Sequence, residues 1–312
     1  MTYNKLNNLS GWLIFALGFI VYLLTVSPTA SFWDCGEFIA TANEFMVPHP
    51  PGAPLYMLIG RMFILLGIGA EVSYMMNLLS VIASAFTGLF TFWTITMLAK
   101  RIRAPNADEP KKGITYAIMA AGAVGGAAVF FCSSFWFNAV EAEVYALSSM
   151  FSALIVWLMF KWEARAHHPG SFRWLILIAF LIGLSFGVHL LSLLTIPALA
   201  LIYYFRVKDF SWKGFFATLG ISAVLVGVVQ IFMGIYTFKI AWLFEKVFTG
   251  TVDVTTGETT GMGMPQWTGT IIFFLLLFGG IGYGIYYTAK TKKVMANIAL
   301  VDTLCDLLDA IA

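Results

Sequence analysis

Two carboxylates stand three residues apart at the start of the first long polar segment. Asp34 and Glu37 lie within residues 31–42, and on a helix this spacing places both side chains on one face. Trp33 and Phe38 make the surroundings less polar, which raises the proton affinity of a carboxylate. Such a group can accept a proton from a hydroxyl as a general base. Alternatively, Asp34 only caps the helix that Glu37 begins, because a short acidic side chain accepts free amide protons of a first turn.

A rigid, proline-rich turn follows, and it carries a histidine. Four of the ten prolines lie in residues 48–54, around His49. A histidine between prolines is by default a water-exposed turn residue, but the fixed backbone would also hold its imidazole in one place beside a polar substrate. Residues 55–70 are apolar except for Arg61, which predicts a helix lying in the membrane interface. Arg61 would then bind a lipid headgroup or a phosphate, or simply extend its charge toward water.

Further polar residues stand beside predicted membrane helices. Glu141 and Glu143 precede an apolar run, where the helix dipole favours an acidic residue but one would suffice. His189 lies inside the uncharged stretch 174–204. It is either a structural histidine bonded to a backbone carbonyl or a residue that faces a substrate.

The sequence contains no diagnostic metal or disulfide pattern. The three cysteines include no CxxC pair, although Cys35 and Cys132 could form a disulfide. No metal ligand is assigned, because no ligand spacing is characteristic of a known site. One set of side chains could still gather a divalent cation such as Mn²⁺ or Mg²⁺, namely Asp34, Glu37, His49 and Glu143.

Membrane helices must position these side chains. Of the 312 residues, 60% are hydrophobic and 11% are charged, which is too little polar surface for a soluble globule of this size. The net charge of +2 gives no reason to expect nucleic-acid binding. A span needs about 20 apolar residues. Clear runs of this kind occur near residues 12–28, 73–99, 114–132, 144–160, 215–236 and 269–288, and the first lacks a cleavage site, so we expect a retained anchor.

The stretch 174–204 decides the topology. As one helix it would measure about 46 Å, which is too long for one span and short for two. Short cytoplasmic loops carry an excess of lysine and arginine. If the stretch is a hairpin of two short helices, only Arg61, Lys239 and Lys246 of the eighteen basic residues lie outside. The sequence therefore predicts eight spans, both ends cytoplasmic, with residues 29–72 as the first external loop.

The predicted fold is thus an all-α polytopic transmembrane bundle over residues 1–296. Residues 237–267 are expected to form a polar external loop, and His189 lies at the external tip of the hairpin. Residues 297–312 place aspartates among leucines, which predicts a short amphipathic helix rather than a span. We expect the chain to be a fragment or to end early.

The order of these motifs resembles that of a known family. It is a Bacteroidetes polytopic membrane family of unknown function, related to the animal plexin-type protein O-mannosyltransferase. The resemblance covers about residues 10–290 and implies the fold of the GT-C glycosyltransferase superfamily, with an acidic residue in the first external loop. Four motifs carry it: Asp34-x-x-Glu37, His49-Pro-Pro-Gly-x-Pro-Leu, Asn77-Leu and Ala142-Glu143-Val-Tyr.

The resemblance also implies an activity. It is the inverting transfer of a sugar, with mannose as one candidate, from a polyprenyl-phosphate-linked donor to a hydroxyl of a glycan or of a protein serine or threonine. Asp34 would be the general base and Glu37 its partner. Substrates would be bound by His49, Arg61, Glu141, Glu143 and His189. The protein would lie in the bacterial inner membrane with this site facing the periplasm.

The residues alone are also compatible with two other functions. External carboxylates and histidines also serve proton coupling in a transporter or flippase for a lipid-linked or small polar substrate, although transporters usually place ionisable residues inside their spans. A noncatalytic membrane subunit is the third interpretation.

Overall fold

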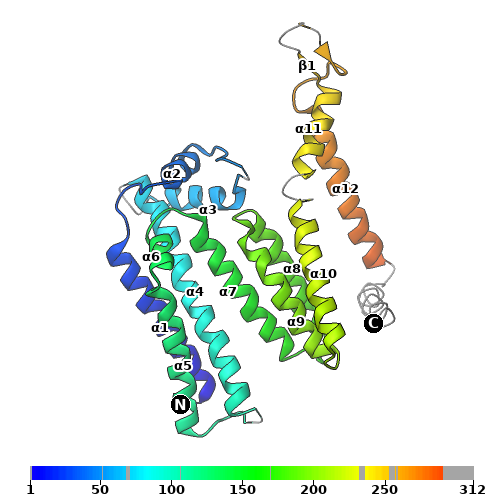
Figure 1. The fold of residues 1–312 in the computed structure, drawn as a ribbon. Helices are drawn as coiled ribbons and strands as arrows, with labels where there is room; N and C mark the ends of the chain where they lie inside the picture. Colours follow the sequence, from blue (N-terminus) through cyan, green and yellow to red (C-terminus); the bar gives the residue numbers. More distant parts are fainter. Residues whose placement is uncertain are drawn as a thin grey trace. The chain divides into compact units, whose positions relative to one another are not determined.

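The structure is a computed structural model that describes residues 2–50, 52–67, 71–105, 107–168, 170–231, 236–252, 257 and 259–290. The chain forms two compact units, Met1–Lys208 and Asp209–Ala312. Nearly all regular structure in the described part is helical (Figure 1). The predicted all-α class is confirmed. Residues 297–312, predicted to form an amphipathic helix, lie outside the described residues.

One long central helix organises the first unit. Helix α4 contacts the three other long helices and carries the largest buried share of the candidate spans. Glycines in this bundle let the neighbouring helices pack closely against α4. The four helices are α1 (Tyr3–Thr25), α4 (Val72–Arg103), α5 (Lys112–Phe130) and α7 (Val144–Glu163).

Three short helices lie at one end of this bundle. Helices α2 (Cys35–Glu44) and α3 (Pro54–Leu65) lie across it, and α6 (Ser133–Val140) joins α5 to α7 (Figure 1). Pro54 starts α3, where its missing N–H costs nothing. The expected helix after the proline-rich turn is therefore present; its place in a membrane interface stays a prediction.

The stretch 174–204 is broken, as the charge pattern predicts. Helix α8 (Phe172–Phe186) ends before a turn at 187–189, and a 3₁₀ segment, η1 (Leu190–Thr195), continues into α9 (Ile196–Val207). The carbonyl oxygen of Gly187 accepts hydrogen bonds from the N–H groups of Leu55 (2.7 Å) and Tyr56 (3.1 Å). The hairpin tip is thereby fixed to the start of α3, at the end of the bundle that carries α2.

The second unit contains helices and a minimal strand pair. Its elements are α10 (Trp212–Ile231), α11 (Thr237–Phe248), β1 (Thr251–Val252), β2 (Thr259–Thr260) and α12 (Thr268–Lys290). The expectation of a polar loop over residues 237–267 is wrong in its first half, because α11 forms there and packs on α12. The Glu245 carboxylate holds the start of α12 by accepting from the N–H groups of Trp267 (2.6 Å) and Thr270 (2.9 Å).

Six helices of the described residues are long and apolar enough to cross a membrane. Five of them match predicted spans, and the sixth is the second half of the hairpin. Helix α8 and the described apolar part of α12 are shorter. The multi-pass architecture is confirmed, and the count of eight spans stays a prediction. The six are Tyr3–Thr25, Val72–Arg103, Lys112–Phe130, Val144–Glu163, Leu190–Val207 and Trp212–Ile231.

Close packing around Phe130 gives the first testable prediction. Its fully buried ring lies against Gly18 of α1 and Gly88 of α4, where an added Cβ would overlap it. Gly88→Ala should destabilise the protein by about 1–3 kcal/mol, because overpacking forces the ring or a helix to move. Thermal unfolding in detergent measures this. The control is Gly113→Ala in α5, where nothing lies within 4 Å of an added Cβ; equal effects of the two changes would contradict the packing.

Candidate active site

Asp34 stands directly before α2, and its carboxylate is not used as a cap. It occupies the N-cap position, but its side chain makes no capping hydrogen bond. The preceding Trp33 has a φ of 63° and is 95% exposed. This left-handed residue turns the chain into the helix. The interpretation that Asp34 only caps α2 is therefore wrong, and its carboxylate is open to other partners.

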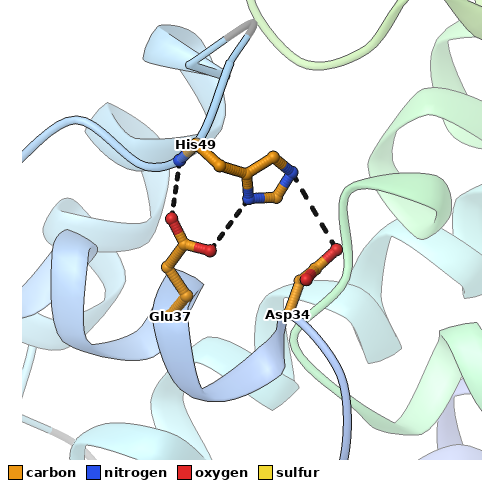
Figure 2. Close-up of side chains that lie close together, drawn as sticks. All are labelled: Asp34, Glu37 and His49. Atoms are coloured by element: carbon orange, nitrogen blue, oxygen red, sulfur yellow. Dashed lines mark hydrogen bonds and ion pairs between the residues drawn. The ribbon is translucent and has the colours of Figure 1, made fainter.

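Glu37 and His49 are joined at two points. The backbone N–H of His49 donates to Glu37 Oε1 (2.6 Å), and the imidazole Nδ1 lies 2.8 Å from Glu37 Oε2. The other ring nitrogen, Nε2, lies 3.9 Å from Asp34 Oδ2 (Figure 2). The imidazole thus stands between the two predicted carboxylates. We call Asp34, Glu37 and His49 the acid–histidine cluster.

The cluster favours opposite charges on Glu37 and His49. The hydrogen bond from the imidazole lowers the pKa of Glu37, and the same bond raises the pKa of His49, with the charges of Glu37 and Asp34 adding to it. Between these two pKa values, Glu37 is ionised and His49 is protonated. The proton on Nδ1 is then held by Glu37, and the N–H at Nε2 faces Asp34. All three side chains remain partly exposed, so a substrate in water can reach them.

Aromatic rings pack beside the imidazole. The Phe38 ring centroid lies 5.7 Å from that of His49, and the fully buried Tyr56 meets Phe38 edge to face at 5.5 Å. Asn77 of α4 fixes the segment between α1 and α2, because its side-chain amide donates to the carbonyls of Ser27 (2.6 Å) and Thr29 (3.1 Å). The family resemblance includes Asn77, whereas the contribution of Tyr56 is not visible in the sequence.

Glu143 is a buried acid next to the cluster. It precedes α7, is 7% exposed, and accepts a hydrogen bond from Cys35 Sγ at 3.6 Å. Burial raises the pKa of Glu143 to about 7, and the charges of Asp34 and Glu141 act in the same direction. Cys35 is therefore a partner of Glu143. The disulfide between Cys35 and Cys132 is not formed, since both thiols are free.

Glu141 lies at the junction of α6 and α7, half-buried. Its backbone carbonyl accepts from the N–H of Glu143 (2.9 Å), and the neighbouring Val140 carbonyl accepts from Ser27 (2.9 Å). Glu141 thus adds negative charge near Cys35 and Glu143. In the described part of the chain, its side chain makes no hydrogen bond or ion pair with the cluster.

His189 lies at the hairpin tip, beside a different residue. Its Nδ1 accepts from the N–H of Leu191 (3.1 Å), and its ring centroid lies 4.9 Å from that of Tyr145. Of the two interpretations left open, the structural one takes a different form here, because Nδ1 bonds to a backbone N–H and not to a carbonyl; a role in binding substrate stays a prediction. Burial lowers the pKa of His189, which favours the neutral ring. Tyr145 follows Glu143 by two residues, so His189 lies on the same side of the bundle as the buried acid.

Arg61 lies at the other end of α2. Its guanidinium donates to the backbone carbonyl of Asn43 and lies 3.4 Å from the Asn43 side-chain oxygen. Asn43 is nine residues after Asp34, about 13 Å along the helix axis. The structure therefore places Arg61 at the carboxyl end of α2, where a cation is stabilised by the helix dipole, and not in the acid–histidine cluster.

The side chains of the cluster also form a candidate cation site. One ligand atom from each of Asp34, Glu37 and His49 lies within 4.8 Å of the other two. Glu143, predicted as a fourth candidate, is not part of this set among the described residues. Carboxylate oxygens and one imidazole nitrogen suit Mn²⁺ or Mg²⁺. With Nδ1 held by Glu37, Nε2 is the nitrogen that such an ion would meet.

The fold and site define a multi-pass helical membrane protein with an acid–histidine cluster at one end of its bundle. Residues 34–212 match the family described as Protein O-mannosyl-transferase TMEM260 N-terminal domain, and the chain belongs to that family. The match begins at Asp34 and includes every predicted site residue.

Two curated relatives carry the same name. The chain is 25% identical over 238 residues to "Protein O-mannosyl-transferase tmem260" of Dictyostelium discoideum, covering 69% of this chain and 26% of that protein. It is 29% identical over 172 residues to "Protein O-mannosyl-transferase TMEM260" of Mus musculus, covering 55% of this chain and 22% of that protein. The matches thus span about a quarter of the length of these relatives. No solved structure matches the chain.

Glu143 gives a prediction of pH dependence. Its folded-state pKa of about 7 lies above the ordinary value of 4.5, so the folded protein binds the proton more tightly than the unfolded chain. This contribution to stability is full below about pH 4.5 and is lost as the pH rises through 7. Glu143→Gln mimics the protonated acid and still accepts from Cys35. Its melting temperature minus that of the wild type should therefore increase from pH 5 to pH 8; a constant difference would show that Glu143 does not titrate there.

Proposed function

We propose that this chain carries the catalytic end of a membrane glycosyltransferase that transfers mannose from a polyprenyl-phosphate-linked donor to a serine or threonine hydroxyl of a protein. The observation that carries the proposal is the uncapped Asp34 carboxylate beside an imidazole held by Glu37, inside the part of the chain that matches the family. The names of the two relatives support mannose and a protein acceptor.

Asp34 is the general base in this proposal. Its side chain is 54% exposed, so an acceptor hydroxyl can approach it from water. The hydroxyl oxygen attacks the anomeric carbon of the sugar from the face opposite the phosphate. The bond between that carbon and the phosphate oxygen breaks, its electron pair stays on the polyprenyl phosphate, and the hydroxyl proton passes to Asp34. The configuration at the anomeric carbon is inverted.

His49 supplies the positive charge of the cluster. Its Nε2 lies 3.9 Å from Asp34, which keeps that carboxylate oriented without a direct short hydrogen bond. Glu37 holds the ring through the backbone and through Nδ1. In this proposal the protonated ring also stabilises the negative charge that the leaving phosphate gains. No divalent cation is invoked in this proposal, and Arg61 is left out because its guanidinium is bound to Asn43.

We assign this site to the non-cytoplasmic face, which in a bacterium is the periplasmic side of the inner membrane. Basic residues at the last turns of α4 and α7 support the assignment: Lys100, Arg101 and Arg103 on α4, and Lys161 on α7. These turns lie at the helix ends remote from α2. The excess of positive charge supports a cytoplasmic position for that end.

Replacing Asp34 tests the chemistry. In the full chain expressed in membranes, Asp34→Asn should lower mannose transfer from a radiolabelled polyprenyl-phosphate donor by about a hundredfold or more, since general-base catalysis contributes about 10²–10⁴. The matched control is Glu44→Gln, an exposed acid at the other end of α2, which should retain wild-type transfer. Undiminished transfer by Asp34→Asn would remove Asp34 from the chemistry. Flipping of the lipid in proteoliposomes without sugar transfer would support a flippase instead.

A further inference from the structure

His189, at the tip of the hairpin, has one ring nitrogen that a ligand can reach. Its Nδ1 accepts from the N–H of Leu191, so the neutral ring carries its proton on Nε2. This Nε2–H group has no partner in the part of the chain that the structure describes, and packing does not bury it completely. Burial of the rest of the ring lowers the pKa of His189, which keeps the ring neutral. The result is an accessible, uncharged hydrogen-bond donor.

The turn that carries His189 is held in place on both sides. The Gly187 carbonyl bonds to the first backbone N–H groups of α3, and Val188 is 1% exposed. Across the turn, the hydroxyls of Ser185 and Ser192 bond to each other, and both residues are fully buried. A donor on such a rigid turn is preorganised, because little conformational entropy is lost when a ligand binds.

Tyr145 lies beside His189 and adds an aromatic surface. The two ring planes are tilted by 59°, and Tyr145 is 41% exposed. Within the described ranges, its hydroxyl has no hydrogen-bond partner. A phenol ring combines an apolar face with a polar tip. A sugar ring likewise carries both C–H groups and hydroxyls, so this pair of side chains suits a sugar.

The charges nearby favour a neutral ligand over an anion. Glu143 precedes Tyr145 by two residues, and the charge of Asp34 acts on it. These acids would repel a phosphate, whereas sugar hydroxyls can donate to carboxylates and accept from the Nε2–H of His189. In the proposed function the phosphate already has a partner in His49, whose pKa is raised by the charge of Glu143 among others.

The hairpin also offers a surface for a lipid-linked molecule. His189 directly precedes the candidate span Leu190–Val207. Two large apolar side chains of the same hairpin are exposed, Phe180 by 60% and Leu194 by 68%. On a membrane hairpin, exposed apolar side chains can contact a prenyl chain. This favours the sugar of the lipid-linked donor over a sugar on a water-borne acceptor.

We propose that His189 and Tyr145 form the subsite that binds the hydroxyl groups of the donor sugar, an inference that rests on the proposed function. The Nε2–H of His189 donates to one sugar hydroxyl. The Tyr145 hydroxyl bonds to another, and its ring lies against the C–H groups of the sugar. His189 therefore recognises the sugar and takes no part in the proton transfer to Asp34.

Binding of two lipids to the full chain in detergent, measured by native mass spectrometry, tests the subsite. The probes are polyprenyl-phosphate mannose and the same polyprenyl phosphate without the sugar. His189→Asn should raise the Kd of the mannosyl lipid about threefold to tenfold, because one hydrogen bond is lost, and leave the Kd of the other lipid unchanged. Asparagine can still accept from the Leu191 N–H, so the melting temperature should stay that of the wild type.

A second variant and a control accompany this measurement. Tyr145→Phe retains the ring and loses the hydroxyl, and it should also weaken binding of the mannosyl lipid alone. If His189→Asn lowers the melting temperature, Tyr145→Phe decides the question with the same two lipids. The matched control is His167→Asn, an exposed histidine in the turn after α7, which should bind both lipids as the wild type does.

The competing explanations have distinct outcomes. An equal loss of both lipids in His189→Asn, or no change in either, overturns the sugar subsite. So does a wild-type protein that binds the mannosyl lipid no more tightly than the lipid without sugar. A raised KM for the acceptor with an unchanged donor Kd would place the subsite on the acceptor instead. A wild-type protein that shows the expected binding pattern but transfers no mannose contradicts the proposed function and supports the subsite.

Discussion

The double attachment of His49 to Glu37 is the interaction on which the site depends. A backbone N–H and a ring nitrogen of one residue are held by the two oxygens of one carboxylate. This arrangement fixes both the position of the chain and the rotation of the imidazole. It closes the proline-rich turn onto α2 and directs Nε2 toward Asp34. Without it, an exposed turn residue and two exposed acids would have no common geometry.

The bundle supplies a firm base for this arrangement. Helix α3 follows the turn and is fixed by the Gly187 carbonyl, while Phe38 packs beside the imidazole and Tyr56 packs on Phe38. The buried Glu143 is attached to Cys35, the first residue of α2. Three segments far apart in sequence therefore meet at one end of the first unit. Charge is separated along the same unit, with acids around α2 and basic residues at the opposite helix ends.

Much of this could be predicted from the sequence, because the relevant signals are local. Apolar run length locates the helices, and the distribution of basic residues predicts the break inside 174–204. The spacing of Asp34 and Glu37 and the rigid turn around His49 identify the cluster. Contacts through space were not predictable: Cys35 with Glu143, and Arg61 with Asn43. The sequence does not predict helix α11, because Lys239 and Glu245 interrupt its apolar residues and give the segment a polar pattern.

The titration of His49 tests the central claim most directly. In full chain labelled with ¹³C-histidine, NMR follows each ring carbon against pH, and the His49 signal is assigned by its loss in His49→Gln. The hydrogen bond that the His49 imidazole donates to Glu37 predicts a His49 pKa above the ordinary value of about 6.5, and a lower pKa in Glu37→Gln. A His49 pKa at or below the ordinary value, unchanged when Glu37 is replaced, would contradict the proposed arrangement of the cluster.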